Sequence, residues 1–279
     1  MTTTLRPSGP LQQADDGSQS RAYEVCVNSR PVGAVDIATV PASGQGVGTI
    51  RGLHIKPADR RRGRGTVAAL AAEEVLRGWR CDRIQITVPS DAAAALRLAT
   101  SLGYTERSRT MLKALRGTGP ETPDGLTIRP MDGAEFEAWQ AMAVEEYARS
   151  WTARGIPEDQ ARAKAEASHR ELLPDGLATR GAHLRVALRD GVTVGHLWVG
   201  QRQLNPGERV AYVWDVGVAE SQRGKGYGRS LMLCAERIAR ESGARQLGLH
   251  VFADNAPARH LYESLGYRAT HVHGAKRLY

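Results

Sequence analysis

An internal repeat is the feature of this sequence that most limits how the chain can fold. Residues 60–65 (RRRGRG) and 223–228 (RGKGYG) share the spacing R-x-x-G-x-G, and the shift from 60 to 223 is 163 residues. The same shift carries Leu102-Gly103-Tyr104 onto Leu265-Gly266-Tyr267. It also aligns three more pairs: Ala95 with Ala258, Leu98 with Leu261, and Ile55 with Val218. A constant shift over about fifty residues indicates a duplicated unit, so we expect two related domains.

The two copies differ at their amino-terminal ends. The second copy begins near Leu126, and applying the shift shows that the first copy lacks roughly the first forty residues of the repeat. Gly and Pro are dense in residues 118–125, and both residue types interrupt helices and strands. We therefore predict a flexible arm over residues 1–20, a truncated domain over 21–117, a linker over 118–125 and a complete domain over 126–279.

Hydrophobic spacing predicts a β-α-α-β-β-β-α-β-α-β order for the second copy. Asp132 and Glu135 have the spacing of a helix capping box, and apolar residues then recur at helical spacing. The expected strands are 126–129, 183–188, 192–200, 210–218 and 246–252, followed by a last extended segment after residue 265. The expected helices are one that follows Asp132 and those over 157–173, 230–241 and 256–265. The first copy has the same order from its second strand onward. This order predicts an α/β fold in which helices flank a mixed sheet.

Composition excludes several classes of protein. The chain is 41% apolar and 24% charged, which is ordinary for a globular protein and excludes a disordered or collagen-like chain. Cys26, Cys81 and Cys234 lie far apart, so the sequence contains neither a disulfide framework nor a close metal-ligand pair. No apolar run approaches the ~20 residues of a membrane span. We expect a cytoplasmic protein without a metal site or a membrane anchor.

The Gly-rich segment of the second copy has the features of an anion site. A strand that leads through such a turn into a helix directs unpaired N–H groups and the positive end of the helix dipole to one point. Arg223 and Lys225 add charge, and the glycines allow a pyrophosphate to approach the backbone. A plain turn with solvated basic side chains has the same spacing, so this motif alone leaves both interpretations open.

A second motif distinguishes between them. Residues 213–229 resemble the first acetyl-CoA motif of the GNAT superfamily of N-acetyltransferases, and residues 255–267 resemble its second motif, N-x-x-A-x-x-L-Y-x-x-L-G-F, with Tyr267 in place of the final Phe. The resemblance covers nearly all of residues 126–279 and most of 23–115. It implies a tandem pair of GNAT domains with splayed sheets, and direct transfer of an acetyl group from acetyl-CoA to an amine.

The resemblance also implies roles for individual residues. Tyr262 occupies the position of the general acid that protonates the leaving thiolate, and Asn255 the position of a residue that holds the cofactor. Backbone groups of Val216, Gly217 and Val218 are expected to bind the pantetheine arm as an added strand. The pyrophosphate is expected at Arg223, Gly224, Lys225, Gly226, Tyr227, Gly228 and Arg229. Tyr262 also lies on an apolar helix face, so a purely structural role stays open.

An ammonium group must lose a proton before it can attack, so a base is expected as well. Asp215 precedes Val218 by three residues and is our first candidate, with His250 in the next strand as the second. The alternatives are a carboxylate bonded to a neighbouring backbone group and a hydrogen-bonded core histidine.

The acceptor is expected over the two helices near the start of the second copy. Acidic and aromatic side chains there suit a cationic amine. The candidates are Glu146, Tyr147, Trp151, Trp198, Trp214 and His250. A solvated acidic face over a packed aromatic core is the alternative interpretation. A drug of aminoglycoside type, a polyamine, an amino acid and a protein amine all remain open as acceptors, and the sequence does not specify an oligomeric state.

The first copy lacks the chemical groups. The shift places Ala92, Ala99 and Gly52 where the second copy has Asn255, Tyr262 and Asp215. Its turn retains a possible second CoA site at Ile55, Arg60, Gly63 and Gly65. Residues 1–118 hold 17 Lys and Arg against 10 Asp and Glu. This excess keeps a nucleic-acid or anion-binding module open as an alternative, beside an idle acyl-CoA sensor. The basic residues are scattered and lack interleaved aromatic residues, so we expect no nucleic acid partner.

Overall fold

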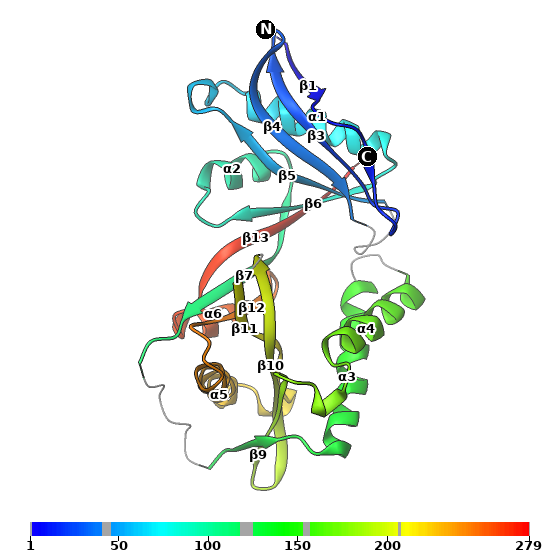
Figure 1. Ribbon diagram of the computed structural model, residues 1–279. Coiled ribbons are helices and arrows are strands. Elements are labelled where there is room, and N and C mark those ends of the chain that lie inside the picture. Colours follow the sequence, from blue (N-terminus) through cyan, green and yellow to red (C-terminus); the bar gives the residue numbers. More distant parts are fainter. Residues whose placement is uncertain (1, 41–45, 118–124, 153–156, 206–207, 279) are drawn as a thin grey trace. The chain divides into compact units, whose positions relative to one another are not determined.

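The computed structural model describes residues 2–40, 46–117, 125–152, 157–205 and 208–278, and the chain forms two compact units (Figure 1). Unit 1 contains residues 1–110, 252–254 and 269–279, and unit 2 contains residues 111–251 and 255–268. Both units have a mixed sheet flanked by helices, which is the predicted fold class. The predicted linker, apart from Gly125, lies outside the described residues.

Unit 1 is built on seven neighbouring strands. Their order is β1 (Thr3–Pro7), β3 (Gln19–Val27), β4 (Arg30–Thr39), β5 (Val47–Ile55), β6 (Arg83–Pro89), β13 (Arg268–Arg277) and β7 (Thr105–Ala114), with β2 (Gln12–Gln13) beside β3. Strands β1 to β5 are antiparallel neighbours, whereas β5 and β6 are parallel. The 3-10 turn Pro57–Asp59 and helix α1 (Arg64–Gly78) follow β5, and α2 (Ala93–Ser101) follows β6. Apolar residues alternate into the core along β3 and β4, as expected for strands with one buried face.

The amino-terminal segment corrects the sequence prediction of a flexible arm. Residues Thr3–Pro7 pair with β3, and Leu5 packs against the core of unit 1. Arg6 donates two hydrogen bonds to the Glu24 carboxylate, at 2.6 and 3.1 Å. The strand was missed because it is short and gains its stability from pairing with a distant segment. The first copy therefore keeps an opening strand and lacks only the two helices that follow that strand in the second copy.

Unit 2 has the strand order β7, β12 (Gln246–Phe252), β11 (Glu208–Val218), β10 (Val192–Asn205), β9 (His183–Arg189) and β8 (Thr127–Pro130). Its helices are α3 (Gly133–Thr152), α4 (Glu158–Leu172), α5 (Tyr227–Glu241) and α6 (Ala256–Ser264), with 3-10 turns at Gly176–Ala178 and Glu220–Gln222. The predicted capping box is confirmed: Asp132 and Glu135 each accept a hydrogen bond from the other's backbone N–H, both at 2.9 Å. Asp190 and Gly191 form the predicted turn, with φ of 51° and 77°.

Two sets of helices cover opposite faces of the unit 2 sheet. His196 and Gly195 are adjacent in β10 and therefore point to opposite faces. Leu231 of α5 lies 3.0 Å from the Cβ position of Gly195, which places α5 on one face. Helices α3 and α4 pack together and cover the other face, where Trp139 of α3 reaches a side chain of β11.

The last strand of each copy contributes to the other copy's unit. Strand β13, at the end of the second copy, pairs antiparallel with β6, from His271 opposite Pro89 to Arg277 opposite Arg83. Conversely, residues 111–114 of β7 belong to unit 2. The sequence assigned residues 126–279 to one domain, and the structure instead places residues 269–279 in unit 1.

A matched polar contact accompanies each exchanged strand. In unit 1, Lys276 of β13 binds Glu73 of α1 at 2.8 Å, and its ammonium lies 5.6 Å from the Tyr104 ring centroid. The repeat places Lys113, Glu236 and Tyr267 at the equivalent positions in unit 2, where Lys113 binds Glu236 at 2.5 Å and lies 5.7 Å from the Tyr267 centroid. Both glutamate side chains are almost fully buried.

Candidate active site in unit 2

Strand β11 has a free edge at its carboxyl end. It pairs with β12 only over Ala211–Val213, whereas its pairing with β10 continues to Val218. The predicted pantetheine-binding residues, Val216, Gly217 and Val218, all lie beyond the last pair with β12. The N–H and C=O groups on this edge are free of strand partners within the described residues, so an extended ligand can add there as a further strand.

The turn after β11 leaves open space around two left-handed glycines. Gly224 and Gly226 have φ of 78° and 85°, and no atom lies within 4 Å of a Cβ built at either position. Gly226 is the N-cap of α5, where unpaired backbone N–H groups favour an anion. Arg223 is well exposed, and Lys225 donates a 2.8 Å hydrogen bond to Gln222. The geometry fits a pyrophosphate group held by backbone and basic side chains.

Two other residues of the motif have structural roles in the turn region. A Cβ at Gly228 would lie 3.3 Å from Leu261 Cδ2, so the glycine allows α6 to pack closely on α5. Arg229 donates a 2.6 Å hydrogen bond to Ser264 Oγ in α6. The side chain of Asn255 caps α6 by accepting a 3.1 Å hydrogen bond from the Ala258 N–H.

The Tyr262 side chain is buried in α6 and keeps its proton at neutral pH. Burial and, secondarily, the negative charge of Asp215 raise the pKa of Tyr262 to about 12. Its ring packs edge-on against Tyr267, with 6.0 Å between centroids. A phenol that keeps its proton at neutral pH is chemically suited to donate that proton to a leaving thiolate.

Asp215 is bound by two side chains from different elements. Its Oδ2 accepts hydrogen bonds from Trp139 Nε1 at 2.8 Å and from His196 Nε2 at 3.0 Å. Trp198 lies opposite Asp215 in the β10–β11 pair, and His196 lies opposite Gly217, so all these side chains share one sheet face. The His196 ring lies against the Gly217 backbone, where a Cβ would overlap it.

Charges around the pair decide its protonation. Burial on its own would raise the pKa of Asp215, but hydrogen bonds and positive charge, chiefly from His196, outweigh burial and lower that pKa. Burial on its own would lower the pKa of His196. The hydrogen bond to Asp215 and the negative charges of Asp215 and Glu146 outweigh burial, so the pKa of His196 is raised. The carboxylate therefore stays ionised, and the imidazole has increased proton affinity.

An aromatic cluster covers this pair. His169 of α4 lies 5.8 Å from Trp198, 6.0 Å from Trp139 and 6.3 Å from Tyr147 between ring centroids. Its Nδ1 donates to the Ala165 carbonyl at 2.9 Å. Trp214 joins the cluster through Trp198, at 5.9 Å.

The structure brings the predicted acceptor aromatic residues into one connected set. Tyr147, Trp198 and Trp214 belong to the aromatic cluster, and Trp151 packs edge-on against Tyr147 with 5.8 Å between centroids. The Lys164 ammonium lies 3.9 Å from the Trp151 ring centroid. His250 is exposed on β12, one residue beyond the last pair with β11.

Sequence reasoning missed His196 and His169 and treated Trp139 only as part of an apolar helix face. His196 interrupts an apolar strand, which is the signal that drew attention to His250. The register that puts it beside Asp215 includes a bulge at Trp214, and a sequence pattern does not reveal such a bulge.

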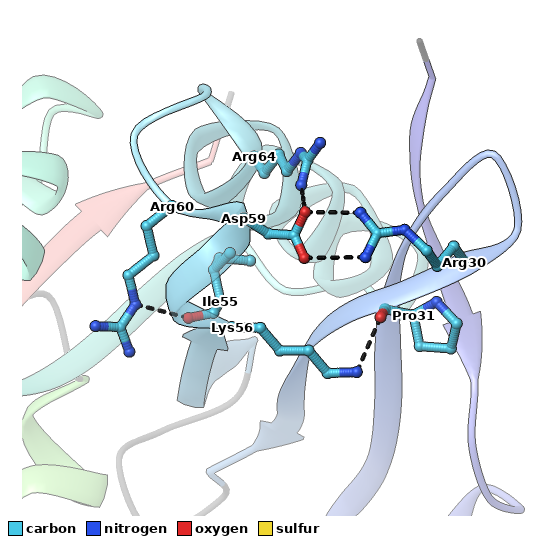
Figure 2. A network of polar contacts seen from close by, with 7 residues as sticks. All are labelled: Arg30, Pro31, Ile55, Lys56, Asp59, Arg60 and Arg64. Carbon is cyan, nitrogen blue, oxygen red and sulfur yellow. Dashed lines mark hydrogen bonds and ion pairs between the residues drawn. The ribbon is translucent and has the colours of Figure 1, made fainter.

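The first copy retains the turn but holds it with different side chains (Figure 2). Asp59 accepts hydrogen bonds from Arg30 at 2.7 and 3.2 Å and is bound by Arg64. Arg60 Nε donates to the Ile55 carbonyl at 2.7 Å, as Arg223 Nε does to the Val218 carbonyl at 3.5 Å.

The remaining predicted residues of this turn also keep their backbone roles. Gly63 has φ of 69° at the N-cap of α1, and a Cβ at Gly65 would lie 3.6 Å from Leu98. Strand β5 pairs with β6 only over Val47–Thr49, so its carboxyl end is free of a β6 partner in the described residues.

Comparison with known proteins identifies the class. The model of the acetyltransferase (GNAT) family matches residues 4–104 and 140–267, and the chain belongs to this family. It is a tandem acetyltransferase that uses acetyl-CoA as co-substrate. No helix in the described ranges is long and apolar enough to cross a membrane.

Individual relatives resemble one copy or both. The chain is 35% identical over 156 residues to the uncharacterized N-acetyltransferase YycN of Bacillus subtilis, covering 55% of this chain and 99% of that protein. It is 31% identical to a mycothiol acetyltransferase of Saccharomonospora viridis, covering 94% of this chain and 85% of the relative. A GCN5-related N-acetyltransferase from Sphaerobacter thermophilus shares the fold with a TM-score of 0.59 at 22% identity, covering 92% of this chain and 80% of that one. A tandem GNAT protein from the clavulanic acid biosynthesis pathway has a TM-score of 0.52 at 20% identity, covering 95% and 85%.

Proposed function

We propose that unit 2 transfers an acetyl group from acetyl-CoA directly to a primary amine, without a covalent enzyme intermediate. The observation that carries this proposal is the meeting of three features in one unit. The free edge of β11 leads into an open Gly-rich turn, a protonated Tyr262 lies within the electrostatic reach of Asp215, and Asp215 is paired with His196.

Backbone groups carry most of the cofactor binding in this proposal. The amides of the turn and the amino end of α5 bind the pyrophosphate, with Arg223, Lys225 and Arg229 adding positive charge. The edge at Val216–Val218 binds the pantetheine arm by β-strand addition. The pyrophosphate site and the pantetheine site lie on α5 and β11, and these regular elements fix the thioester relative to the side chains of β11 and α6.

Two proton transfers complete the reaction. The pair of Asp215 and His196 takes a proton from the acceptor's ammonium, so that the nitrogen lone pair can attack the acetyl carbon. Tyr262 donates its proton to the sulfur as the carbon–sulfur bond breaks. The chain then returns to its starting state by exchanging protons with solvent.

We propose a cationic acceptor bound on the α3 and α4 side of the site. Glu146 is exposed there, and its charge already acts on His196. Aromatic faces such as Tyr147 and Trp151 favour an ammonium group. The names of several relatives add a mycothiol-related amine to the open acceptor classes, which are aminoglycosides, polyamines, amino acids and protein amines.

We assign catalysis to the second copy and a non-catalytic role to the first. Gly52, Ala92 and Ala99 replace the three chemical residues, and the turn at Ile55, Arg60, Gly63 and Gly65 is a candidate for a second CoA site.

A CoA-release assay tests the main proposal. The panel contains polyamines, amino sugars, a mycothiol-related amine, amino acids and lysine or amino-terminal peptides. Release of free CoA with any primary amine supports the proposal. A protein that binds acetyl-CoA and releases no CoA with any amine of the panel contradicts it.

A further inference from the structure

The two members of the Asp215–His196 pair are not equivalent. Both hydrogen bonds to the carboxylate end on Oδ2, and one of them comes from Trp139, which cannot give up its proton at any accessible pH. The lowered pKa of Asp215 makes this carboxylate a weak base. Its geometry is that of a group that orients its neighbours.

The imidazole has one ring nitrogen free for chemistry. Nε2 donates to Asp215, so in the neutral ring the lone pair is on Nδ1. No described residue forms a hydrogen bond with Nδ1 of His196, and the side chain is 17% exposed. The ring lies against Gly217, the central residue of the free β11 edge. A basic nitrogen is therefore held beside the strand that is proposed to carry the thioester.

Charged and titratable groups reach the pair from each helix around it. Glu146 of α3 raises the pKa of His196, positive charge on His169 of α4 lowers the pKa of Asp215, and Tyr262 of α6 has its pKa raised by Asp215. These groups lie around the half-buried Asp215 carboxylate, whose one ion-pair partner among the described residues is His196.

We infer that His196 Nδ1 is the proton acceptor for the amine, and that Asp215 is a positioning residue that fixes the ring and stabilises its protonated form. This inference rests on the proposed function. An N–H bond of the ammonium breaks, its electron pair stays on nitrogen, and the proton bonds to Nδ1. The lone pair then forms the carbon–nitrogen bond as the carbon–sulfur bond breaks. A second proton then leaves the nitrogen. The nitrogen has thus released two protons in all, while the sulfur has gained one, so the net reaction releases one proton to solvent.

The pH dependence of kcat/KM separates the two roles. We expect the wild-type rate to rise with pH through a value above the ordinary histidine pKa of about 6.5, because the neutral ring is the active form. In Asp215→Asn this rise of kcat/KM occurs at lower pH, because the hydrogen bond and the negative charge that raise the pKa of His196 are lost. His196→Gln lowers the plateau by ~10²–10⁴-fold and abolishes this rise. His260→Gln, on an exposed position of α6, is the matched control and keeps the wild-type profile.

An acceptor that is already neutral gives a second readout. An aromatic amine carries no proton at neutral pH, so His196→Gln should lose far less rate with it than with an aliphatic amine. Added imidazole should partly restore His196→Ala with the aliphatic amine. Histidine NMR titration of the folded Asp215→Asn protein should give a lower His196 pKa than in wild type.

Two results overturn the inference without touching the proposed function. One is a His196→Gln variant that has the wild-type kcat/KM and the wild-type pH dependence with an aliphatic amine. The other is an equal loss with neutral and cationic acceptors, which assigns His196 to structure. Absence of turnover in wild type with every amine contradicts the proposed function instead.

Discussion

The two Gly-rich turns have one backbone conformation in two chemical settings. Gly63 and Gly226 begin their helices with φ of 69° and 85°. Two residues earlier, Arg61 and Gly224 have φ of 56° and 78°. A non-glycine residue in this left-handed region costs on the order of 1–3 kcal/mol, so contacts around the first turn must hold Arg61 there.

Different side chains fix the two turns. In the first copy, the buried Asp59 carboxylate binds two guanidinium groups, the exposed one of Arg30 and the buried one of Arg64. The equivalent residue in the second copy is Gln222, which accepts a hydrogen bond from Lys225. The first turn is therefore held by ion pairs to Asp59, whereas the second is held by the hydrogen bond between Lys225 and Gln222. Both turns keep exposed basic side chains beside an open glycine.

The residues that precede α2 and α6 share one backbone conformation and differ in their side chains. Ala92 has φ and ψ of −80° and 62°, close to the −85° and 68° of Asn255, although only Asn255 provides a side-chain cap. The backbone is kept because packing of the following helix requires it. The difference in side chain at this position agrees with the non-catalytic role that we propose for the first copy.

The largest expected effect separates the turns directly. Gly226→Val should abolish acetyl-CoA binding by unit 2 and all turnover, because valine is strained at positive φ and its side chain fills the space expected for the pyrophosphate. Gly63→Val should leave the chemical step intact. Calorimetry and CoA release measure both variants, and a melting curve verifies folding. Loss of turnover in a folded Gly63→Val protein that still binds acetyl-CoA through unit 2 would refute the division of labour.

Tyr262→Phe tests the role of the phenol as proton donor, a group that is absent at the equivalent Ala99 of the first copy. We expect kcat to fall by ~10²–10⁴-fold with unchanged acetyl-CoA affinity, because the ring packing remains and only the proton donor is removed. In wild type, ionisation of Tyr262 should not lower the rate until the pH approaches its pKa of about 12. A variant rate within about twofold of wild type at saturating substrate would assign Tyr262 to the core.

The paired lysines test whether the exchanged strands are equivalent. Removing one partner of a buried ion pair costs about 3–5 kcal/mol where the remaining charge has no other counterion. Glu236 keeps Arg240 at 3.3 Å, so we expect the smaller cost in unit 2. Lys113→Met should therefore destabilise unit 2 and lower activity, whereas Lys276→Met should destabilise unit 1. Hydrogen exchange in α5 and α1 reports the two effects separately. Equal loss of protection in both helices from either variant would show that the units unfold together.

The smallest effect concerns the cap of the last helix. Asn255→Ala should cost about 1 kcal/mol in unit 2, and Ala92→Asn should stabilise unit 1 by a similar amount, since its backbone already has the capped conformation. Denaturant unfolding of both variants measures the change. A neutral Ala92→Asn would mean that its side chain cannot reach the N–H of the following turn.

Local patterns predicted the elements well, and long-range pairings were beyond them. The repeat, both motifs, the capping box at Asp132 and the turn at Asp190 depend on neighbouring residues, and the sequence contains them directly. Strand β1 and the position of β13 depend on which distant strand offers a free edge. His196 was missed because its place beside Asp215 requires the hairpin register, including the bulge at Trp214.

The crossed last strands give the first copy a structural role in unit 2. Unit 2 contains residues 111–114 of the first copy, and Lys113 neutralises the buried Glu236 of its central helix. A fragment comprising only residues 126–279 would carry every proposed catalytic side chain and still lack a strand and Lys113, one of the two cations that bind Glu236. Each half of the chain thus serves as a folding cofactor for the other. Under the proposed division of labour, the catalytic half therefore depends on the first half, as a subunit of an obligate dimer depends on its partner.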